Sequence, residues 1–205
     1  MTQQNQRNLS REGVIMARML TPHLIEEHRN WADSSDAWDD LAASCIDAGT
    51  MIRELINALR DETAKNHPAE PIRGFFGKYR FLSNFFDAPV MYNDVTYANN
   101  EAAFQAQKCP KRAAEFASLN PSEAKRLGRR VELRQDWEYM KETIMHEIVL
   151  AKFAQNEELR RRLLETGCSR LFEENNWGDT TWGTVNGKGQ NLLGIILEDV
   201  RDELR

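Results

Sequence analysis

The sequence predicts a helix-rich α+β fold with a small sheet, preceded by an α-helical hairpin. Residues 10–59 carry helix-start signals and helical hydrophobic spacing. Two short β-prone runs flank Asn93-Asp94, and capped helical segments follow from residue 99 to the C-terminus. A proline-containing stretch at 65–71 separates the two groups. We therefore expect an acidic helical extension at 1–68 and a main domain at 69–205.

The extension is predicted to hold two helices. Ser10 is a candidate cap for the first, and Thr21-Pro22 restarts or kinks it. Ser35 opens the second, whose apolar residues alternate at heptad spacings of three and four: Trp38, Leu41, Cys45, Ala48, Ile52, Leu55 and Leu59. This stripe packs either against residues 14–25, which its short length favours, or against a second copy or a partner. The extension is thus a candidate homodimer interface.

Composition and charge narrow the functional classes. The chain has 205 residues, of which 41% are hydrophobic, enough for one ordinary core. Residues 1–70 carry 7 Lys and Arg against 12 Asp and Glu, whereas residues 71–205 carry 20 of each. The net charge of −5 therefore comes from residues 1–70, which argues against general nucleic-acid binding.

No sequence feature indicates a membrane or an oxidising compartment. No apolar run approaches the roughly 20 residues of a membrane helix, and the N-terminus has no apolar segment of the signal-peptide kind. Cys45, Cys109 and Cys168 are widely spaced, without a CxxC pair or a Cys/His cluster. We therefore expect reduced thiols, no metal site and a cytoplasmic protein without a membrane partner.

The main domain is predicted to begin with strands and continue with helices. Ile72–Phe76 is a candidate strand, and Asn93-Asp94 between two β-prone runs is a two-residue hairpin signal. Helices follow, most with a capping residue or a breaker: 99–109 before Pro110, 110–119, one from Asn120, Asp136 to about 154, 157–166 before Gly167, and 192–204. Residues 168–174 are a further candidate strand.

Two stretches carry candidate binding residues. Glu101, Gln105 and Lys108 stand at i, i+4 and i+7, which places them on one helix face, although such a face is more often simply solvated. Residues 175–191 hold four glycines and two tryptophans, a composition that suits close backbone approach and stacking on a base. Lys188 and Asn191 stand where the last helix begins, a position that favours an anion such as phosphate. The Gly-Lys-Gly turn is not a Walker loop, which argues against an ATPase.

Nine motifs occur in the order found in one known family: Leu82-Ser-Asn-Phe85; Glu101 with Phe104-Gln-Ala-Gln-Lys108; Ala124-Lys-Arg-Leu-Gly-Arg129; Leu133-Arg-x-x-Trp137; Lys152-Phe-x-Gln-Asn156; Leu163-Leu-x-Thr-Gly167; Leu171-Phe-Glu173; Asp179-x-x-Trp182-Gly183; and Gly187-x-Gly189-x-Asn191-x-x-Gly194. On these motifs, residues 75–204 resemble the NADAR superfamily, whose best-known branch is the YbiA-like N-glycosidases. The resemblance implies a helix-rich α+β domain with a small sheet, and no cofactor.

The resemblance also implies an activity. Family members hydrolyse the bond between ribose C1′ and a nitrogen. The branches act on phosphorylated ribosylamino-pyrimidine intermediates of riboflavin synthesis, or remove ADP-ribose from guanine bases. We therefore expect an N-glycosidase that takes a phosphorylated ribosyl substrate, with riboflavin intermediates first. The alternatives are an ADP-ribosyl glycohydrolase and a non-catalytic sensor of NAD or ADP-ribose.

The matching positions suggest individual roles. Glu101 corresponds to the essential glutamate of the family, which stabilises the oxocarbenium-like state or activates water. Asp179 is expected to orient ribose hydroxyls or that water, and Trp182 to stack on the base or shield the site. The remaining residues expected to bind substrate are Ser83, Asn84, Gln105, Lys108, Glu173, Lys188 and Asn191.

Two positions depart from the YbiA-like pattern. That branch has His-Tyr where this chain has Ala102-Ala103, which changes base recognition more than bond cleavage. It also has an acid where this chain has Thr184. If that acid is the catalytic partner, this chain would be slow or would use Asp179 instead.

Overall fold

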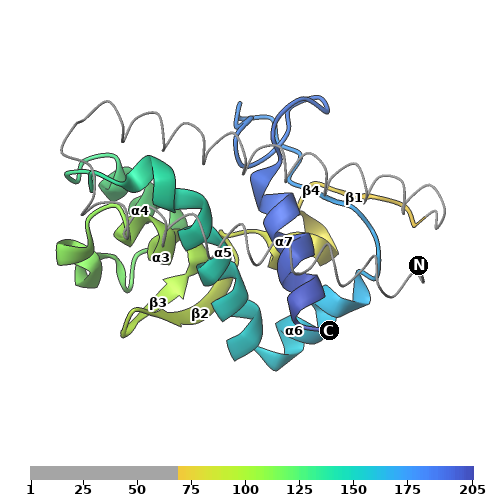
Figure 1. The fold of residues 1–205 in the computed structure, drawn as a ribbon, viewed down its shortest axis with the longest axis horizontal. Helices are drawn as coiled ribbons and strands as arrows, with labels where there is room; N and C mark the ends of the chain where they lie inside the picture. The colour runs from red at the N-terminus through yellow and green to blue at the C-terminus, as the bar shows by residue number, and fades with distance from the viewer. Residues whose placement is uncertain (1–68) are drawn as a thin grey trace, which may run out of the picture. The chain divides into compact units, whose positions relative to one another are not determined.

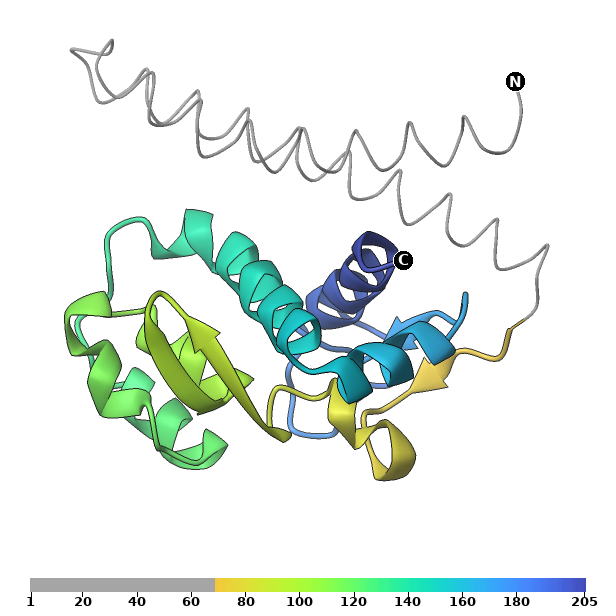
Figure 2. The same cartoon turned by 90° about the horizontal axis from the view of Figure 1, so that it is seen from below.

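Two helices, α5 (Trp137–Gln155) and α7 (Leu192–Glu203), cross the middle of residues 69–205, the part of the chain that the computed structural model describes (Figure 1). One side holds β2 (Asp87–Tyr92), β3 (Val95–Asn99), α3 (Asn100–Ala106) and α4 (Pro121–Gly128). The other side holds β1 (Ile72–Arg73), β4 (Leu171–Phe172) and α6 (Glu157–Glu165), as Figure 2 also shows. The predicted helical hairpin and its heptad stripe lie outside the described residues and stay predictions.

The β structure consists of two strand pairs. β2 and β3 are antiparallel with Val90 opposite Tyr97, and Asn93 and Asp94 both have the positive φ of a tight two-residue turn, at 49° and 60°. β1 pairs with β4 in parallel, with Ile72 opposite Leu171. The predicted hairpin and the helix-rich fold with little sheet are therefore confirmed.

The core lies between the hairpin, α3 and α5. Val90 and Tyr97 on the hairpin and Ile148 on α5 are fully buried. Ala102 and Ala106 of α3 are buried as well, and their small side chains let the helix approach its neighbours closely. This packing fixes α3, the helix that carries Glu101.

Several predicted helix boundaries are confirmed by hydrogen bonds. The side chain of Asn99 accepts a bond of 2.8 Å from the Ala102 amide and so caps α3. Asn120 and Glu123 form a complete capping box at the start of α4, in which each side chain accepts the other's backbone N–H. Gly167 follows α6 with a φ of 62°, the left-handed conformation expected after a helix end.

Three local predictions were wrong in detail. Asp136 precedes α5 but makes no capping bond, because Arg134 binds both oxygens of its carboxylate at 2.5 and 2.7 Å. Pro110–Phe116 forms a 3-10 helix, η2, rather than an α-helix. β1 ends after two residues, since Gly74 turns the chain with a φ of 72°.

A second 3-10 helix, η1, spans Gly77–Leu82. Within residues 69–205, no helix is long and apolar enough to cross a membrane.

Candidate active site

Glu101 stands in the first turn of α3 with only 6% of its surface exposed. Gln105, one turn later, donates a hydrogen bond of 2.9 Å from Nε2 to Oε1 of Glu101, so the two share one face as predicted. Lys108 lies beyond the end of α3, and its Nζ is 5.5 Å from the centre of the Trp137 ring. A carboxylate is therefore held in a fixed orientation, with an amide and an amine nearby.

The segment after η1 lies against the start of this helix. The carbonyl oxygen of Asn84 accepts a bond of 3.1 Å from the Glu101 amide, and its side-chain oxygen accepts one of 3.3 Å from Asn100. The hydroxyl of Ser83 accepts a bond of 3.1 Å from the Phe85 amide. Ser83 and Asn84 thus fix the backbone where the Glu101 side chain begins.

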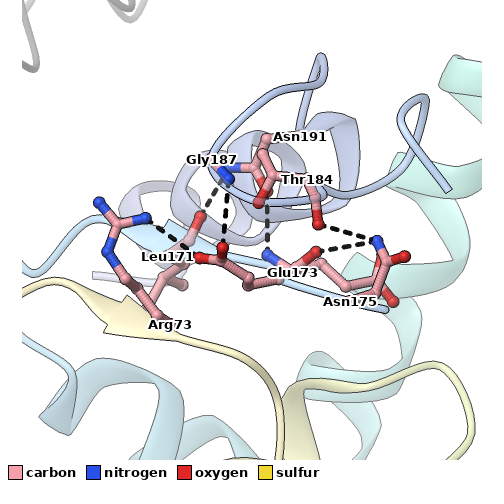
Figure 3. A network of polar contacts seen from close by, with 8 residues as sticks. Arg73, Leu171, Glu173, Asn175, Thr184, Gly187 and Asn191 are labelled. Atoms are coloured by element: carbon pink, nitrogen blue, oxygen red, sulfur yellow. Dashed lines mark hydrogen bonds and ion pairs between the residues drawn. The ribbon is translucent and has the colours of Figure 1, made fainter. Parts of the chain in front are cut away.

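The Gly/Trp-rich loop, residues 175–191, is held together by backbone hydrogen bonds, such as that from Gln190 to the Thr180 carbonyl at 2.7 Å, and by bonds from side chains to its backbone. Asn175 accepts from the Asp179 amide at 3.1 Å and donates to the carbonyl of Asp179 at 2.7 Å. It also donates to the carbonyl of Thr184 at 3.1 Å (Figure 3). One carboxylate oxygen of Asp179 accepts from the amides of Thr181 and Trp182, at 3.1 and 2.9 Å. Asn175 was not predicted as a site residue; it closes the turn that carries Asp179.

Asn191 fixes the strand end that carries Glu173. Its side-chain oxygen accepts from the Glu173 amide at 2.9 Å, and its amide group donates to the Leu171 carbonyl at 2.8 Å (Figure 3). Gly194, in the first turn of α7, allows this contact, because a Cβ there would lie 2.0 Å from the Leu171 oxygen. The Asn191 side chain thus supports the loop, and its predicted contact with phosphate stays a prediction.

The outer end of the loop is tied to β1. The Glu174 carboxylate pairs with Arg73 at 3.2 Å and accepts a bond of 3.2 Å from the Gly187 amide (Figure 3). Lys188 is exposed in the adjoining turn, where its amide donates to the Val185 carbonyl. Lys188 is thus the predicted site residue that the structure gives no contact with the others.

Contacts between aromatic rings join the loop to α3 and α5. Trp182 meets Phe104 edge to face with ring centres 5.3 Å apart, and Phe104 lies 5.0 Å from Trp137. Such arrangements contribute about 0.5–1.5 kcal/mol per pair beyond the buried area. Trp182 is therefore packed against the core on at least one side while it follows directly on the Asp179 turn.

Three carboxyl groups from different parts of the chain influence one another. Burial raises the pKa of Glu101, and the neighbouring Asp179 raises it further. Burial raises the pKa of Glu173 to about 8, with added contributions from Asp179 and then Glu101. At neutral pH Glu173 therefore keeps its proton. Carboxyl groups with raised pKa values gather at functional sites more often than elsewhere.

Two lysines, Lys108 and Lys125, lie near these acids and counteract the rise in their pKa values. Lys125 on α4 does the most to offset the effect of burial on the pKa of Glu101, and it also lowers that of Glu173. Burial lowers the pKa of Lys108, and Glu101 opposes that shift. Within residues 69–205, neither lysine has a carboxylate within 4.0 Å. The amines are thus near the acids without being paired to them, as expected beside a site for an anionic ligand.

The comparisons with known proteins bear on this arrangement. The family model for the NADAR domain matches residues 70–205. The chain belongs to the NADAR family. N-glycosidase YbiA of Shigella boydii is 39% identical over 132 residues, which cover 62% of this chain and 82% of that protein.

A solved structure supports the fold assignment of this NADAR domain. The NMR structure of YbiA from E. coli superposes with a TM-score of 0.59 at 36% identity, and the match covers 66% of this chain and 86% of that one. The riboflavin biosynthesis protein VVA0006 of Vibrio vulnificus is 34% identical over 131 residues, 61% of this chain but only 35% of that protein.

The residues that differ from the YbiA-like pattern lie inside this NADAR domain. Ala102 and Ala103 are fully buried, so this chain presents no polar side chain to the site from these positions. Thr184 is 3% exposed, and its hydroxyl has no hydrogen-bond partner within residues 69–205. Position 184 therefore carries no ionisable group in this chain, and the loop acid that raises the pKa of Glu101 is Asp179.

The sequence pattern missed Lys125 because it predicted α4 without its orientation. Gly128 in that helix shows which side faces the site: a Cβ on Gly128 would lie 2.0 Å from Oε1 of Gln105. Lys125 stands one turn earlier on the same helix. Within residues 69–205, no three His, Cys, Asp or Glu side chains are placed to hold a metal ion.

Proposed function

We propose that this NADAR domain is an N-glycosidase that hydrolyses the bond between ribose C1′ and a nitrogen in a phosphorylated ribosyl substrate. The observation that carries the proposal is the buried Glu101 carboxyl. It lies within electrostatic reach of Glu173, which follows β4, and of Asp179 on the Gly/Trp-rich loop. Family membership and two relatives, one named an N-glycosidase and one a riboflavin biosynthesis protein, support it.

Glu101 is assigned the central role. As the C1′–N bond breaks, positive charge grows on the sugar ring, and a nearby carboxylate stabilises it. Burial strengthens that attraction and also makes the group a better proton acceptor, since a pKa closer to neutrality favours general-base catalysis. The bond from Gln105 holds the carboxylate in place. Water then adds to C1′, and Glu101 accepts its proton.

Glu173 is the candidate proton donor. Its pKa of about 8 means that it carries a proton at neutral pH, whereas most surface carboxyls have lost theirs. Two carboxyls that divide acid and base roles do so when one is protonated and the other ionised, and we assign the acid role to Glu173 and the base role to Glu101. Glu173 would pass its proton to the departing nitrogen, and Asp179 would orient a ribose hydroxyl or the water.

The remaining residues define the substrate class. Lys108 and Lys125 would supply positive charge for a phosphate, because among residues 69–205 neither has a carboxylate within 4.0 Å. Trp182 would cover the base or the sugar, since its ring is fixed by Phe104 on one side. Ser83, with Asn84, would line the sugar pocket at the start of α3. Riboflavin-pathway ribosylamino-pyrimidine phosphates are the first substrates to test.

Mass spectrometry of reaction products tests the proposal. The full chain is incubated separately with ribosylamino-pyrimidine phosphates, ADP-ribosylated DNA and NAD. Release of ribose 5-phosphate and a free pyrimidine supports an N-glycosidase of riboflavin-pathway intermediates. Release of ADP-ribose from DNA supports the ADP-ribosyl alternative instead. If all three are bound but none is cleaved, the chain is a sensor and the enzyme proposal is wrong.

A further inference from the structure

Lys152 is a buried lysine that the mechanism above does not use. It stands near the end of α5 with 1% of its surface exposed. Its Nζ donates to the carbonyl oxygens of Phe81 at 2.7 Å and Ser83 at 3.0 Å. Within residues 69–205, no carboxylate lies within 4.0 Å of this amine. Two backbone oxygens are therefore its polar partners.

The surroundings of this amine are apolar. The ring centres of Phe153 and Phe86 lie 5.2 and 5.5 Å from Nζ. Burial alone lowers the pKa of Lys152 to about 7, and no acidic or basic neighbour contributes to that shift. The ammonium and the neutral amine are thus both accessible near neutral pH. The charged form makes the stronger bonds to carbonyl oxygens.

The segment whose carbonyl oxygens accept from Lys152 continues directly into the candidate active site. Ser83 is followed by Asn84, whose carbonyl accepts the Glu101 amide at 3.1 Å. The Asn84 side chain accepts from Asn100 at 3.3 Å. It also donates at 3.2 Å to the sulfur of Met145, which lies on α5 two turns before Lys152. The segment between Phe81 and Asn84 is therefore fixed to α5 at two points and to α3 at two more.

We propose that Lys152 is a positioning residue: from α5 it holds the 81–84 segment against the start of α3, and so sets the orientation of the Glu101 carboxyl. No contact between Lys152 and a substrate is required. A buried lysine without an acidic partner is costly, because the amine must leave water. A purely structural site could have used an uncharged residue at lower cost.

NMR spectroscopy tests the structural part without any assay of turnover. The ¹⁵N signal of Lys152 Nζ and the backbone amide signals of Asn84 and Glu101 are followed from pH 5 to 9. The amides are expected to shift with the same midpoint as Lys152, near pH 7. Glu101 and Glu173 are acids nearby whose pKa values are raised, and the pKa of Lys108 is lowered. In Glu101→Gln, Glu173→Gln and Lys108→Met variants, each of which removes one of these groups, the shift with the Lys152 midpoint should persist.

Substitution of the lysine supplies the matched comparison. Lys152→Met fills the same apolar space but cannot donate, so the part of the shift at Asn84 and Glu101 that follows the Lys152 midpoint should disappear and the Glu101 amide should exchange with solvent faster. Lys111→Met, which changes an exposed lysine on η2, should leave both signals unchanged. Unaltered amide shifts and exchange in a folded Lys152→Met variant would overturn the proposal. If that variant does not fold, the wild-type titration decides, and amides that do not follow Lys152 overturn it.

The catalytic consequence rests on the function proposed above. Misplacement of a reacting group by about 1 Å can lower turnover roughly 10²-fold. Lys152→Met is therefore expected to lower kcat strongly while KM changes little, because the lysine does not touch the substrate. A rise in KM at constant kcat would contradict a positioning role. Absence of turnover in the wild type would contradict the proposed function and leave the NMR result standing.

Discussion

The acids of the candidate site are held in two different ways. Glu101 belongs to a regular helix whose neighbours Ala102 and Ala106 are packed in the core. Glu173 and Asp179 belong to a strand end and a loop, where the side chains of Asn175 and Asn191 add hydrogen bonds to those between backbone groups. The helix-borne acid thus depends on packing, whereas the positions of the loop-borne acids depend also on two amide side chains.

This difference separates two kinds of sensitivity. A change at Glu101 alters chemistry while α3 stays in place, because its cap and core contacts do not involve the carboxylate. A change at Asn191 leaves every acid present but removes bonds that position Glu173. The first kind should affect turnover and the second stability, and each prediction below tests one side of this contrast.

The largest effect is expected at Glu101. Glu101→Gln keeps the size of the side chain but removes its charge and its capacity to take a proton, so turnover should fall by about 10²–10⁴-fold. Circular dichroism should show an unchanged fold. Glu132→Gln, at an exposed position before α5, is the matched control and should keep wild-type turnover. Equal rates for the two variants would remove Glu101 from the mechanism.

Asn191→Ala should be the most damaging change to the loop. It leaves the Leu171 carbonyl and the Glu173 amide without their partner. Each buried polar group left unsatisfied costs about 1–3 kcal/mol, so a loss of about 2–6 kcal/mol in unfolding free energy is expected in urea titrations. Asn176→Ala, on an exposed asparagine of the same loop, should change stability little. A similar small change for both would show that the loop does not depend on Asn191.

The titration of Glu173 should make the unfolding free energy depend on pH. Its pKa is about 8 in the folded chain and near 4.5 when unfolded, so the folded chain keeps a proton that the unfolded chain has lost. Its contribution to stability therefore falls as the pH rises from about 4.5 to about 8. Glu173→Gln removes this dependence, so the Tm of the variant should rise relative to that of the wild type as the pH increases through that window. A constant difference in Tm between pH 5 and 9 would contradict this.

The smallest effect is expected at the outer end of the loop. Arg73 and Glu174 form an ion pair with side chains 52% and 32% exposed. Such pairs contribute about 0–1 kcal/mol. Arg73→Ala should therefore shift unfolding free energy by less than about 1 kcal/mol and leave turnover near the wild-type value. A loss as large as that of Asn191→Ala would mean that this pair, and not the amide, holds the loop.

The same contrast explains what could be predicted from the sequence. The caps at Asn99 and Asn120 and the turn at Asn93-Asp94 depend on local chemistry, which the sequence displays directly. Asp136 failed as a cap because a competing partner, Arg134, stood two residues away. Local patterns do not decide such a competition.

The site required information that no local pattern contains. Lys125 faces Glu101 only because α4 packs on α3 through Gly128 and Gln105. The loop conformation depends on which backbone groups Asn175 and Asn191 reach, up to 20 residues away along the chain. The resemblance to NADAR proteins pointed to Glu101, Glu173 and Asp179, but the effect of Asp179 on the pKa values of Glu101 and Glu173 became visible only in three dimensions.

A crystal structure of Glu101→Gln with an uncleaved ribosyl phosphate tests the central claim most directly. We expect ribose C1′ within about 3–3.5 Å of the residue 101 amide or of a water bound to it, the separation typical of reacting atoms. The phosphate should lie toward Lys108 and Lys125. A sugar bound elsewhere, with its C1′ turned away from residue 101 and from the Gly/Trp-rich loop, would contradict the account.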